Sequence, residues 1–403
     1  MSRPGTVAAD APAPYASRPG TSRGRLHTEP PSPSRTDFQR DRDRIIHATA
    51  FRRLQHKTQV FVAPTGDHYR TRLTHTVEVA QIARSAARAL GLDEDLSEAL
   101  ALAHDLGHPP FGHAGEDALN DAMDAHGGFD HNVQTFRIVT KLERRYAAFD
   151  GLNLTWELLE GMVKHNGPLE GPLAEDRSAP PAFAEYCTRQ DLELATWGGP
   201  EAQIASLADD VAYISHDLDD GVRAGLFPPS GLRDVTLAGP VMAEVMTLYP
   251  DAEPARLTHE TVRRLIDRML SDLVAETRRR ADAASPGSAD EVRALPHALV
   301  AFSPEMGEEV KELRAFLHKN MYRDAGVLEK AKEGARIVGE LFRHYAEFPE
   351  HLPNDWQPPP DGAGEEDRAA RWVADYIAGM TDRYAFDRQA EHLMDRKGAA
   401  QIL

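Results

Sequence analysis

Residues 93–116, DEDLSEALALAHDLGHPPFGHAGE, contain a predicted helix and the signal that ends it. Acidic side chains in the first turn favour a helix start, and apolar side chains then recur at helical spacing. These apolar positions are Leu96, Ala99, Leu100 and Ala103. The helix, predicted to reach Leu106, cannot continue through Gly107 and the prolines at 109–110, because proline lacks a donor and clashes with the preceding turn. Three histidines, an aspartate and a glutamate surround this break.

Helical periodicity continues on both sides of this stretch. Apolar positions in HTVEVAQIARSAARALG, residues 75–91, recur on one helix face and end at a glycine suited to a C-terminal cap. Further helices are predicted at 132–147, 153–164, 200–224, 257–283, 306–346 and 366–395. Alternating strand patterns are scarce, apart from one short extended stretch at 58–64. The chain is therefore predicted to be all-α.

The composition excludes several classes of protein. The 403 residues are 41% hydrophobic and 27% charged, as in soluble globular proteins, and the single Cys187 allows neither an internal disulfide nor a cysteine-based zinc site. A formal net charge of −18 argues against nucleic acid as the main partner, because binding phosphates needs clustered Lys and Arg. Without a secretory signal or a membrane-spanning apolar run, we expect a cytoplasmic protein with no membrane partner.

Composition and charge change along the chain. Residues 1–34 are rich in Pro, Ala, Ser and Gly and almost free of large apolar side chains, so we expect a disordered tail. Residues 36–90 hold ten Lys or Arg against five Asp or Glu. This basic segment is either an ordinary solvated face or a pocket for an anionic small molecule such as a phosphate ester.

His104 and Asp105 are candidate metal ligands. Adjacent residues on a helix point about 100° apart, so the pair cannot face one core but can converge on an ion at the helix edge. Imidazole and carboxylate together suit a divalent cation. His75 begins the preceding predicted helix, and a later one supplies Asp209 or Asp210, a carboxylate whose burial is costly without a cation or a hydrogen-bond partner.

Longer segments around these residues resemble the successive motifs of the deoxyguanosine-triphosphate triphosphohydrolases, within the HD phosphohydrolase superfamily. These segments are RDRDRIIHATAFRRLQHKTQVF, RTRLTHTVEVAQIARS, AHDLGHPPFGHAGE, GGFDHNVQTFRI and LADDVAYISHDLDDGVRAG. The C-terminal YIAGMTDRYA resembles the end of the family's associated helical region. The resemblance covers residues 36–395 and implies an HD-domain helical bundle over 35–225, with its motifs within 72–220. An associated helical region over 226–403 would complete the nucleotide pocket.

This resemblance implies a metal-dependent hydrolase of triphosphoric monoesters that converts dGTP, or dNTPs generally, to the deoxynucleoside and inorganic triphosphate. The metal ligands it implies are His75, His104, Asp105 and Asp209. Asp209 is preferred over Asp210 because the family's ligand has a tyrosine four residues on, here Tyr213. Mg²⁺ or Mn²⁺ is the expected metal, with Fe²⁺, Ni²⁺ and Zn²⁺ as further candidates.

By the same resemblance, His113 and Glu116 form the catalytic pair, with Glu116 orienting His113 and raising its basicity. Attack by water and a covalent histidine intermediate are both open. His108 and His131 would lie near the phosphates. The substrate-binding residues that the resemblance implies are Arg53, Gln59, Arg72, Tyr213, Asp217, Arg314 and Tyr322. For the last two, an exposed arginine and a core tyrosine are the alternative.

Two other functions are consistent with these residues. Another HD hydrolase, acting on a nucleoside monophosphate, a cyclic nucleotide or guanosine tetraphosphate, would use the same ligands. A non-catalytic nucleotide-sensing scaffold would keep them without turnover. The resemblance also implies a homo-oligomer and an allosteric dNTP, although no regulatory residue stands out in this sequence.

Overall fold

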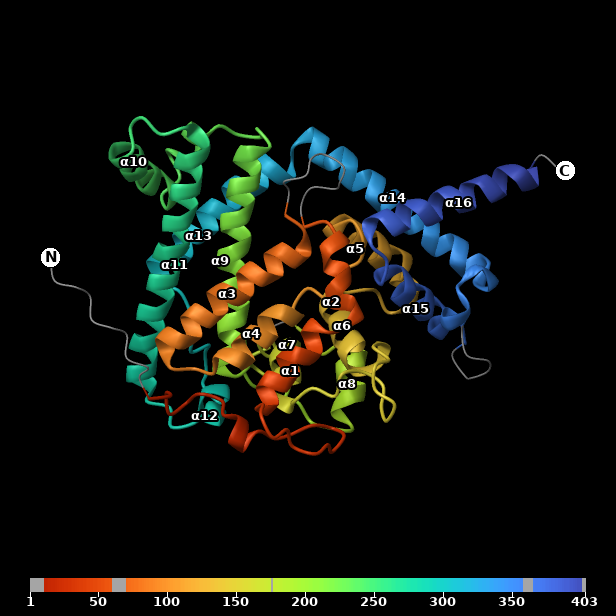
Figure 1. Ribbon diagram of the computed structural model, residues 1–403, viewed down its shortest axis with the longest axis horizontal. Coiled ribbons are helices and arrows are strands. Elements are labelled where there is room, and N and C mark those ends of the chain that lie inside the picture. Colours follow the sequence, from red (N-terminus) through yellow and green to blue (C-terminus); the bar gives the residue numbers. More distant parts are fainter. Residues whose placement is uncertain (1–10, 60–69, 175–176, 358–364, 401–403) are drawn as a thin grey trace. The chain divides into compact units, whose positions relative to one another are not determined.

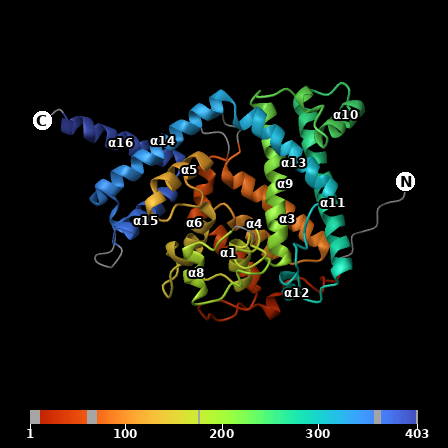
Figure 2. The ribbon, with the colours of Figure 1, turned by 180° about the vertical axis from the view of Figure 1, so that it is seen from behind.

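The regular structure of the chain is helical (Figures 1 and 2). The computed structural model describes residues 11–59, 70–174, 177–357 and 365–400. No sheet forms among these residues, where strand-like pairing is confined to isolated bridges such as that between Thr58 and Thr71. Most of the extended stretch expected at 58–64 lies outside the described residues. The prediction of an all-α chain is confirmed.

Two compact units interleave along the chain. The first unit contains the described residues within 1–46, 76–103 and 152–321. The second unit contains the described residues within 47–75, 104–151 and 322–403. Each unit thus combines segments that are far apart in sequence.

The first unit is built around long helices. Its helices are α1 (Asp37–Ile46), α3 (Arg72–Leu90, from Thr76 on), α4 (Glu94–Ala103), α7 (Trp156–Val163), α8 (Pro181–Cys187), α9 (Pro200–Arg223), α10 (Ala238–Leu248), α11 (Pro254–Ala284), α12 (Ala289–Arg293) and α13 (Pro304–Leu317). Helix α4 packs against α1 and α9, and α9 runs beside α11 and α13 (Figure 1). In the described part of the chain, no helix is both long and apolar enough to cross a membrane.

The second unit surrounds a separate apolar core. Its helices are α2 (Thr49–Arg53), the first turn of α3, α5 (Gly112–Ala122), α6 (His131–Arg137), α14 (Ala325–Glu347), α15 (Glu365–Ala378) and α16 (Asp382–Ala400). Helix α14 lies along α5 and also packs against α15 and α16. Phe111, Leu119 and Met123 bury their side chains among apolar residues of α14 and α15. This core fixes α5, which carries two of the candidate catalytic residues.

The N-terminal segment corrects the expectation of a disordered tail over 1–34. The structure describes this segment from residue 11 onward, and the side chain of Tyr15 is buried. The Ser17 backbone N–H donates to the buried carboxylate of Glu201 at 2.9 Å, and Arg25 pairs with the buried carboxylate of Asp41. Buried carboxylates on α9 and α1 thus hold a segment that has few apolar side chains. The amino-acid composition of the segment does not reveal such partners.

The single helix predicted at 306–346 is two helices in the structure. Helix α13 ends at Leu317 and a π-helical turn follows over His318–Tyr322. Asp324 then caps α14 by accepting hydrogen bonds from the backbone N–H groups of Gly326 and Val327 at 2.8 and 3.2 Å. Asp324 thus starts a second helix at a point where the apolar pattern of the sequence continues without a break.

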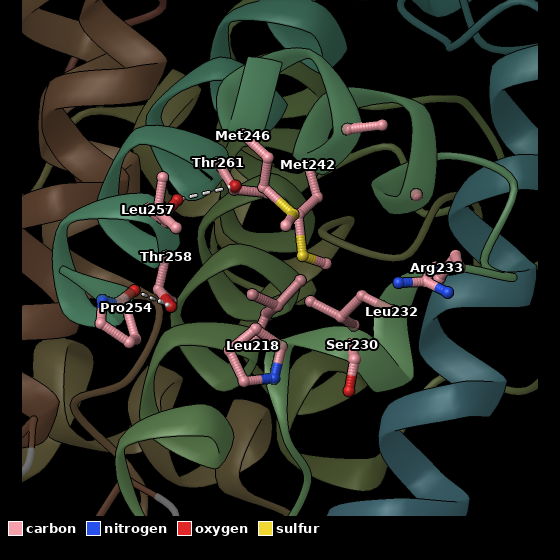
Figure 3. A pocket seen from close by; sticks show the side chains of 13 residues that line it. Leu218, Ser230, Leu232, Arg233, Met242, Met246, Pro254, Leu257, Thr258 and Thr261 are labelled. Atoms are coloured by element: carbon pink, nitrogen blue, oxygen red, sulfur yellow. Dashed lines mark hydrogen bonds between the residues drawn. The ribbon is translucent and has the colours of Figure 1, made fainter. Parts of the chain in front are cut away.

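A cavity of about 340 Å³ lies in the first unit, between α10, α11 and the end of α9 (Figure 3). Met242 and Met246 line it, and the hydroxyls of Thr258 and Thr261 bond to carbonyls of their own helix at 3.1 and 2.8 Å. Its described lining contains no imidazole or carboxylate. It therefore lacks the groups needed for the chemistry implied by the sequence motifs.

Candidate active site

The candidate site begins where α4 ends. That helix stops at Ala103, three residues before the expected end at Leu106, and residues 104–107 form a turn. Thr135 on α6 holds this turn, since its hydroxyl accepts from the Gly107 N–H at 2.8 Å and donates to the His104 carbonyl at 3.3 Å. The helix therefore ends at Ala103, and His104 is the first residue of the turn.

Gly107 allows α6 to approach the turn closely. A Cβ at this position would lie 2.1 Å from the carbonyl oxygen of His131 and 2.3 Å from the backbone nitrogen of Thr135. Both are backbone atoms, so the clash could be relieved only by moving the helix. The glycine that we expected to serve the turn is required mainly by this helix contact.

We expect Gly107→Ala to destabilise the protein by about 3 kcal/mol or more, because overpacking against backbone leaves no flexible atom to move. Gly339→Ala is the matched control, since no atom outside its own helix lies within 4 Å of a Cβ there. Thermal unfolding of both variants checks this expectation. A Gly107→Ala protein as stable as Gly339→Ala would contradict the packing described.

His75, His104 and Asp105 meet at the start of α3. The rings of His75 and His104 lie edge to face with centroids 5.5 Å apart, and one nitrogen of each is within 4.8 Å of the other. The Asp105 Oδ1 atom lies 3.4 Å from His104 Nε2 and accepts from Arg72 Nη1 at 2.9 Å. Burial alone would raise the pKa of Asp105, but Arg72, with smaller contributions from the two neighbouring imidazoles, holds it well below its usual range.

Unsatisfied polar atoms in this cluster fit a metal and an anion. Asp105 Oδ2 is buried and has no hydrogen-bond partner among the described residues, and the same is true of Arg72 Nε and Nη2. Buried polar atoms are rarely left without partners in native proteins. A divalent cation would satisfy the carboxylate oxygen, and phosphate oxygens would satisfy the guanidinium, so the groups present suit both ligands.

His108 connects the turn to α6. Its Nε2 atom lies 3.2 Å from Asp105 Oδ1, and its ring stacks on that of His131 with centroids 3.9 Å apart and planes inclined by 16°. Burial, followed by the charge of Arg72, holds the pKa of His108 well below its usual range. The imidazole is therefore neutral at physiological pH.

The partner of Glu116 differs from the expected one. Its Oε1 atom accepts from the His131 backbone N–H at 2.8 Å and lies 2.7 Å from His131 Nδ1, whereas the prediction had Glu116 orient His113. Burial would raise the pKa of Glu116, but the hydrogen bonds to His131 and the charges of His131 and His113 together outweigh it and lower the pKa. The N-terminus of α6 attracts the carboxylate, because its first N–H groups lack helical partners.

His113 lies one turn before Glu116 on α5 and is exposed. A ring nitrogen of His113, one of His108 and a carboxylate oxygen of Glu116 all lie within 4.8 Å of one another. Partial desolvation and the charge of Arg72 lower the pKa of His113. His113 thus belongs to the same cluster, but its ring is oriented by proximity to His108 rather than by a bond to Glu116.

The candidate substrate residues fall into both units. In the second unit, Gln59 is buried, and its backbone carbonyl oxygen lies 3.5 Å from where a Cβ on Gly112 would stand. Arg53 lies against Gly379. Burial lowers the pKa of Arg53. Tyr322 ends the π-helical turn and is half-buried.

In the first unit, Tyr213 and Asp217 follow Asp209 at intervals of four residues on α9, so the three share one helix face. Arg314 on α13 donates to Asp210 Oδ1 at 2.8 Å, and both side chains are about half exposed. That ion pair matches the alternative of an exposed arginine. The wider π-helical turn after α13 also shifts Tyr322 from the regular helical spacing that placed it on the face of Arg314.

Two further residues of the site were missed from the sequence. Lys57 is buried, and its Nζ donates to the carbonyls of His108 at 2.5 Å and Ala378 at 2.7 Å. Burial, more than the nearby Arg53, lowers its pKa to about 7. Asp382 accepts from the backbone N–H of Phe111 at 3.0 Å. Both lie in segments that carried the family resemblance, but neither has a spacing that predicts contact.

Comparison with known proteins places these features in a family. Residues 72–214 match the HD domain, and residues 300–391 match the phosphohydrolase-associated domain. A deoxyguanosinetriphosphate triphosphohydrolase-like protein of Parvibaculum lavamentivorans is 58% identical over 380 residues, covering 94% of this chain and 96% of the relative.

Two further relatives bear the same description. That of Brucella ovis is 56% identical over 388 residues, covering 95% of this chain and 96% of its own. That of Cereibacter sphaeroides is 53% identical over 378 residues, covering 94% of this chain and 98% of its own. The chain therefore belongs to the deoxyguanosinetriphosphate triphosphohydrolase-like proteins, a family of HD-domain phosphohydrolases.

Proposed function

We propose that this protein hydrolyses 2′-deoxynucleoside 5′-triphosphates to the deoxynucleoside and inorganic triphosphate. The observation that carries the proposal is the cluster in the second unit, where buried histidines and carboxylates adjoin a buried arginine with unsatisfied donors. Such a cluster can hold a divalent metal and an anionic substrate side by side. The names of the relatives, all described as triphosphohydrolase-like, support the same substrate class.

His75, His104 and Asp105 would hold the metal, with Asp209 of α9 as the fourth ligand implied by the motif. Two imidazoles and two carboxylates suit Mn²⁺, Fe²⁺, Ni²⁺ or Zn²⁺, and Mg²⁺ suits the carboxylates. A bound divalent metal would offset the charge that develops on the α-phosphate.

Arg72 and His108 are proposed to hold the phosphates. Two of the guanidinium nitrogens of Arg72 have no hydrogen-bond partner among the described residues, although the side chain is 1% exposed. A planar guanidinium grips phosphate oxygens bidentately, and its pairing with Asp105 fixes its plane. In its neutral form His108 has a single N–H, which faces Asp105 Oδ1 at 3.2 Å, so its ring, stacked on that of His131, would hold the phosphates by packing against them.

His113 and Glu116 are proposed to move the protons. Hydrolysis adds water to the α-phosphorus and breaks its bond to the 5′-oxygen, so that oxygen must gain a proton as it leaves. His113 can act as base or acid, since it is exposed and one turn from Glu116. Glu116 would act on His113 through its charge while holding His131, the partner that the structure shows for it.

Chromatography of reactions with single nucleotides and with dNTP mixtures, each with Mg²⁺ or Mn²⁺, tests the substrate class. We expect dNTPs to be consumed and nucleoside monophosphates, cyclic nucleotides and guanosine tetraphosphate to be left intact. Turnover that requires two dNTPs together would support the proposed allosteric dNTP, and mass measurement with and without dNTP would test the homo-oligomer. Consumption of a monophosphate or cyclic nucleotide instead would overturn the proposed substrate.

A further inference from the structure

Asp382, at the start of α16, connects two segments of the candidate site. Its Oδ1 atom accepts from the backbone N–H of Phe111 at 3.0 Å. Its Oδ2 atom accepts from the backbone N–H of Thr58 at 3.0 Å and from the Thr58 hydroxyl. The carboxylate is buried, with a residue exposure of 6%, and each of its two oxygens is used. The Asp382 side chain thus connects Thr58, the residue before Gln59, to Phe111, the residue before α5.

Phe111 has a backbone that needs such support. Its φ angle is +65°, in the left-handed region that non-glycine residues adopt only at an energetic cost. It stands directly before α5 and two residues before His113. Its ring is buried and meets that of Phe386 edge to face at 5.0 Å. The ring and the bond to Asp382 together set the direction in which α5 starts.

The same C-terminal segment holds the other side of the loop. Lys57, next to Thr58, donates to the carbonyls of His108 and Ala378, and Ala378 lies four residues before Asp382. The loop over 108–111 is thereby fixed at both ends, by an ammonium group at the first residue and a carboxylate at the last. None of these bonds uses a ring nitrogen of His108 or His113.

We propose that Asp382 is a positioning residue that sets the orientation of the 108–111 loop and the start of α5, and with them the placement of His108 and His113 against the substrate. This inference rests on the proposed function. It also gives the phosphohydrolase-associated region, residues 300–391, a defined task at the site. A displacement of catalytic groups by about 1 Å can cost a hundredfold in rate, so Asp382 can influence turnover strongly without touching substrate.

Asp382→Ala tests this role in the full-length, metal-loaded protein. We expect kcat per metal-bound site to fall ten- to a hundredfold at unchanged metal content, with faster hydrogen exchange at the Phe111 amide. Asp382→Asn keeps the shape and one acceptor and should recover part of kcat. Asp387→Ala is the matched control, because Asp387 lies on the same helix, is exposed and, among the described residues, meets only the exposed Arg383 at 3.9 Å.

Wild-type kcat per metal-bound site in Asp382→Ala, even with lower thermal stability, would make Asp382 merely structural and overturn the inference. If that variant does not fold, Asp382→Asn carries the same comparison, and unchanged kcat and unchanged exchange there would overturn it as well. A wild-type protein that consumes no nucleotide would instead overturn the proposed function. Exchange at the Phe111 amide would then decide whether Asp382 orders the loop.

Discussion

Replacing Asp105 by asparagine is expected to lower turnover of a dNTP roughly a thousandfold, because a metal contributes several kcal/mol to phosphoryl chemistry. Asp105 is 3% exposed, and its Oδ1 atom lies within 3.4 Å of Arg72, His104 and His108. Asparagine keeps the shape and an acceptor for Arg72 but removes the charge that a divalent cation requires. Metal content after dialysis and the rate of triphosphate release measure the two consequences.

Asp121→Asn is the matched control for this substitution, since Asp121 is exposed on α5 in the same unit. It should retain metal and turnover within about twofold of the wild type, as surface substitutions away from special features usually do. Asp105→Asn protein that keeps its metal and its rate would remove Asp105 from the site. Thermal unfolding of both variants separates a lost ligand from a lost fold.

The second large effect is expected at His113. His113→Ala should lower kcat by about 10²- to 10⁴-fold, the range of general acid–base catalysis, while metal content stays near normal. The reason is geometric: a ring nitrogen of His113 lies within 4.8 Å of His108 and Glu116, and its side chain is exposed on α5 and is not one of the proposed metal ligands. Single-turnover rates and metal analysis of the same preparation check both statements.

His126→Ala is the control for His113→Ala. His126 lies in the same unit and pairs with the exposed Asp367 at 2.7 Å, so its loss should leave turnover unchanged. Loss of metal in His113→Ala would give His113 a structural role instead. A wild-type rate in that variant would assign the proton transfer to another group, such as His131, which contacts Glu116.

The local features of this site could be predicted, because they follow from short-range rules. A helix that ends before Gly107, an all-α chain and histidines on a loop beside an ionisable cluster are consequences of periodicity and of proline and glycine chemistry. The end of α4 was misplaced by three residues because the hydroxyl of Thr135, 31 residues further on, fixes the turn.

The errors concern partners that are distant in sequence. Glu116 bonds to His131 rather than to His113, since the free N–H groups at the start of α6 lie beside it. Asp382 reaches Phe111 across 271 residues, and Ser17 reaches Glu201 across 184. Neither spacing nor composition contains such pairings, which arise only when the helices pack.

Product analysis with dGTP tests the central claim most directly. The protein, supplied with Mn²⁺ or Mg²⁺, is incubated with dGTP, and the products are separated by anion-exchange chromatography and identified by phosphorus NMR. Cleavage of the bond between the α-phosphorus and the 5′-oxygen predicts deoxyguanosine and intact triphosphate in equal amounts from the earliest time points. Release of pyrophosphate with dGMP, or of single phosphates with dGDP, would contradict it, because those products require cleavage further along the phosphate chain.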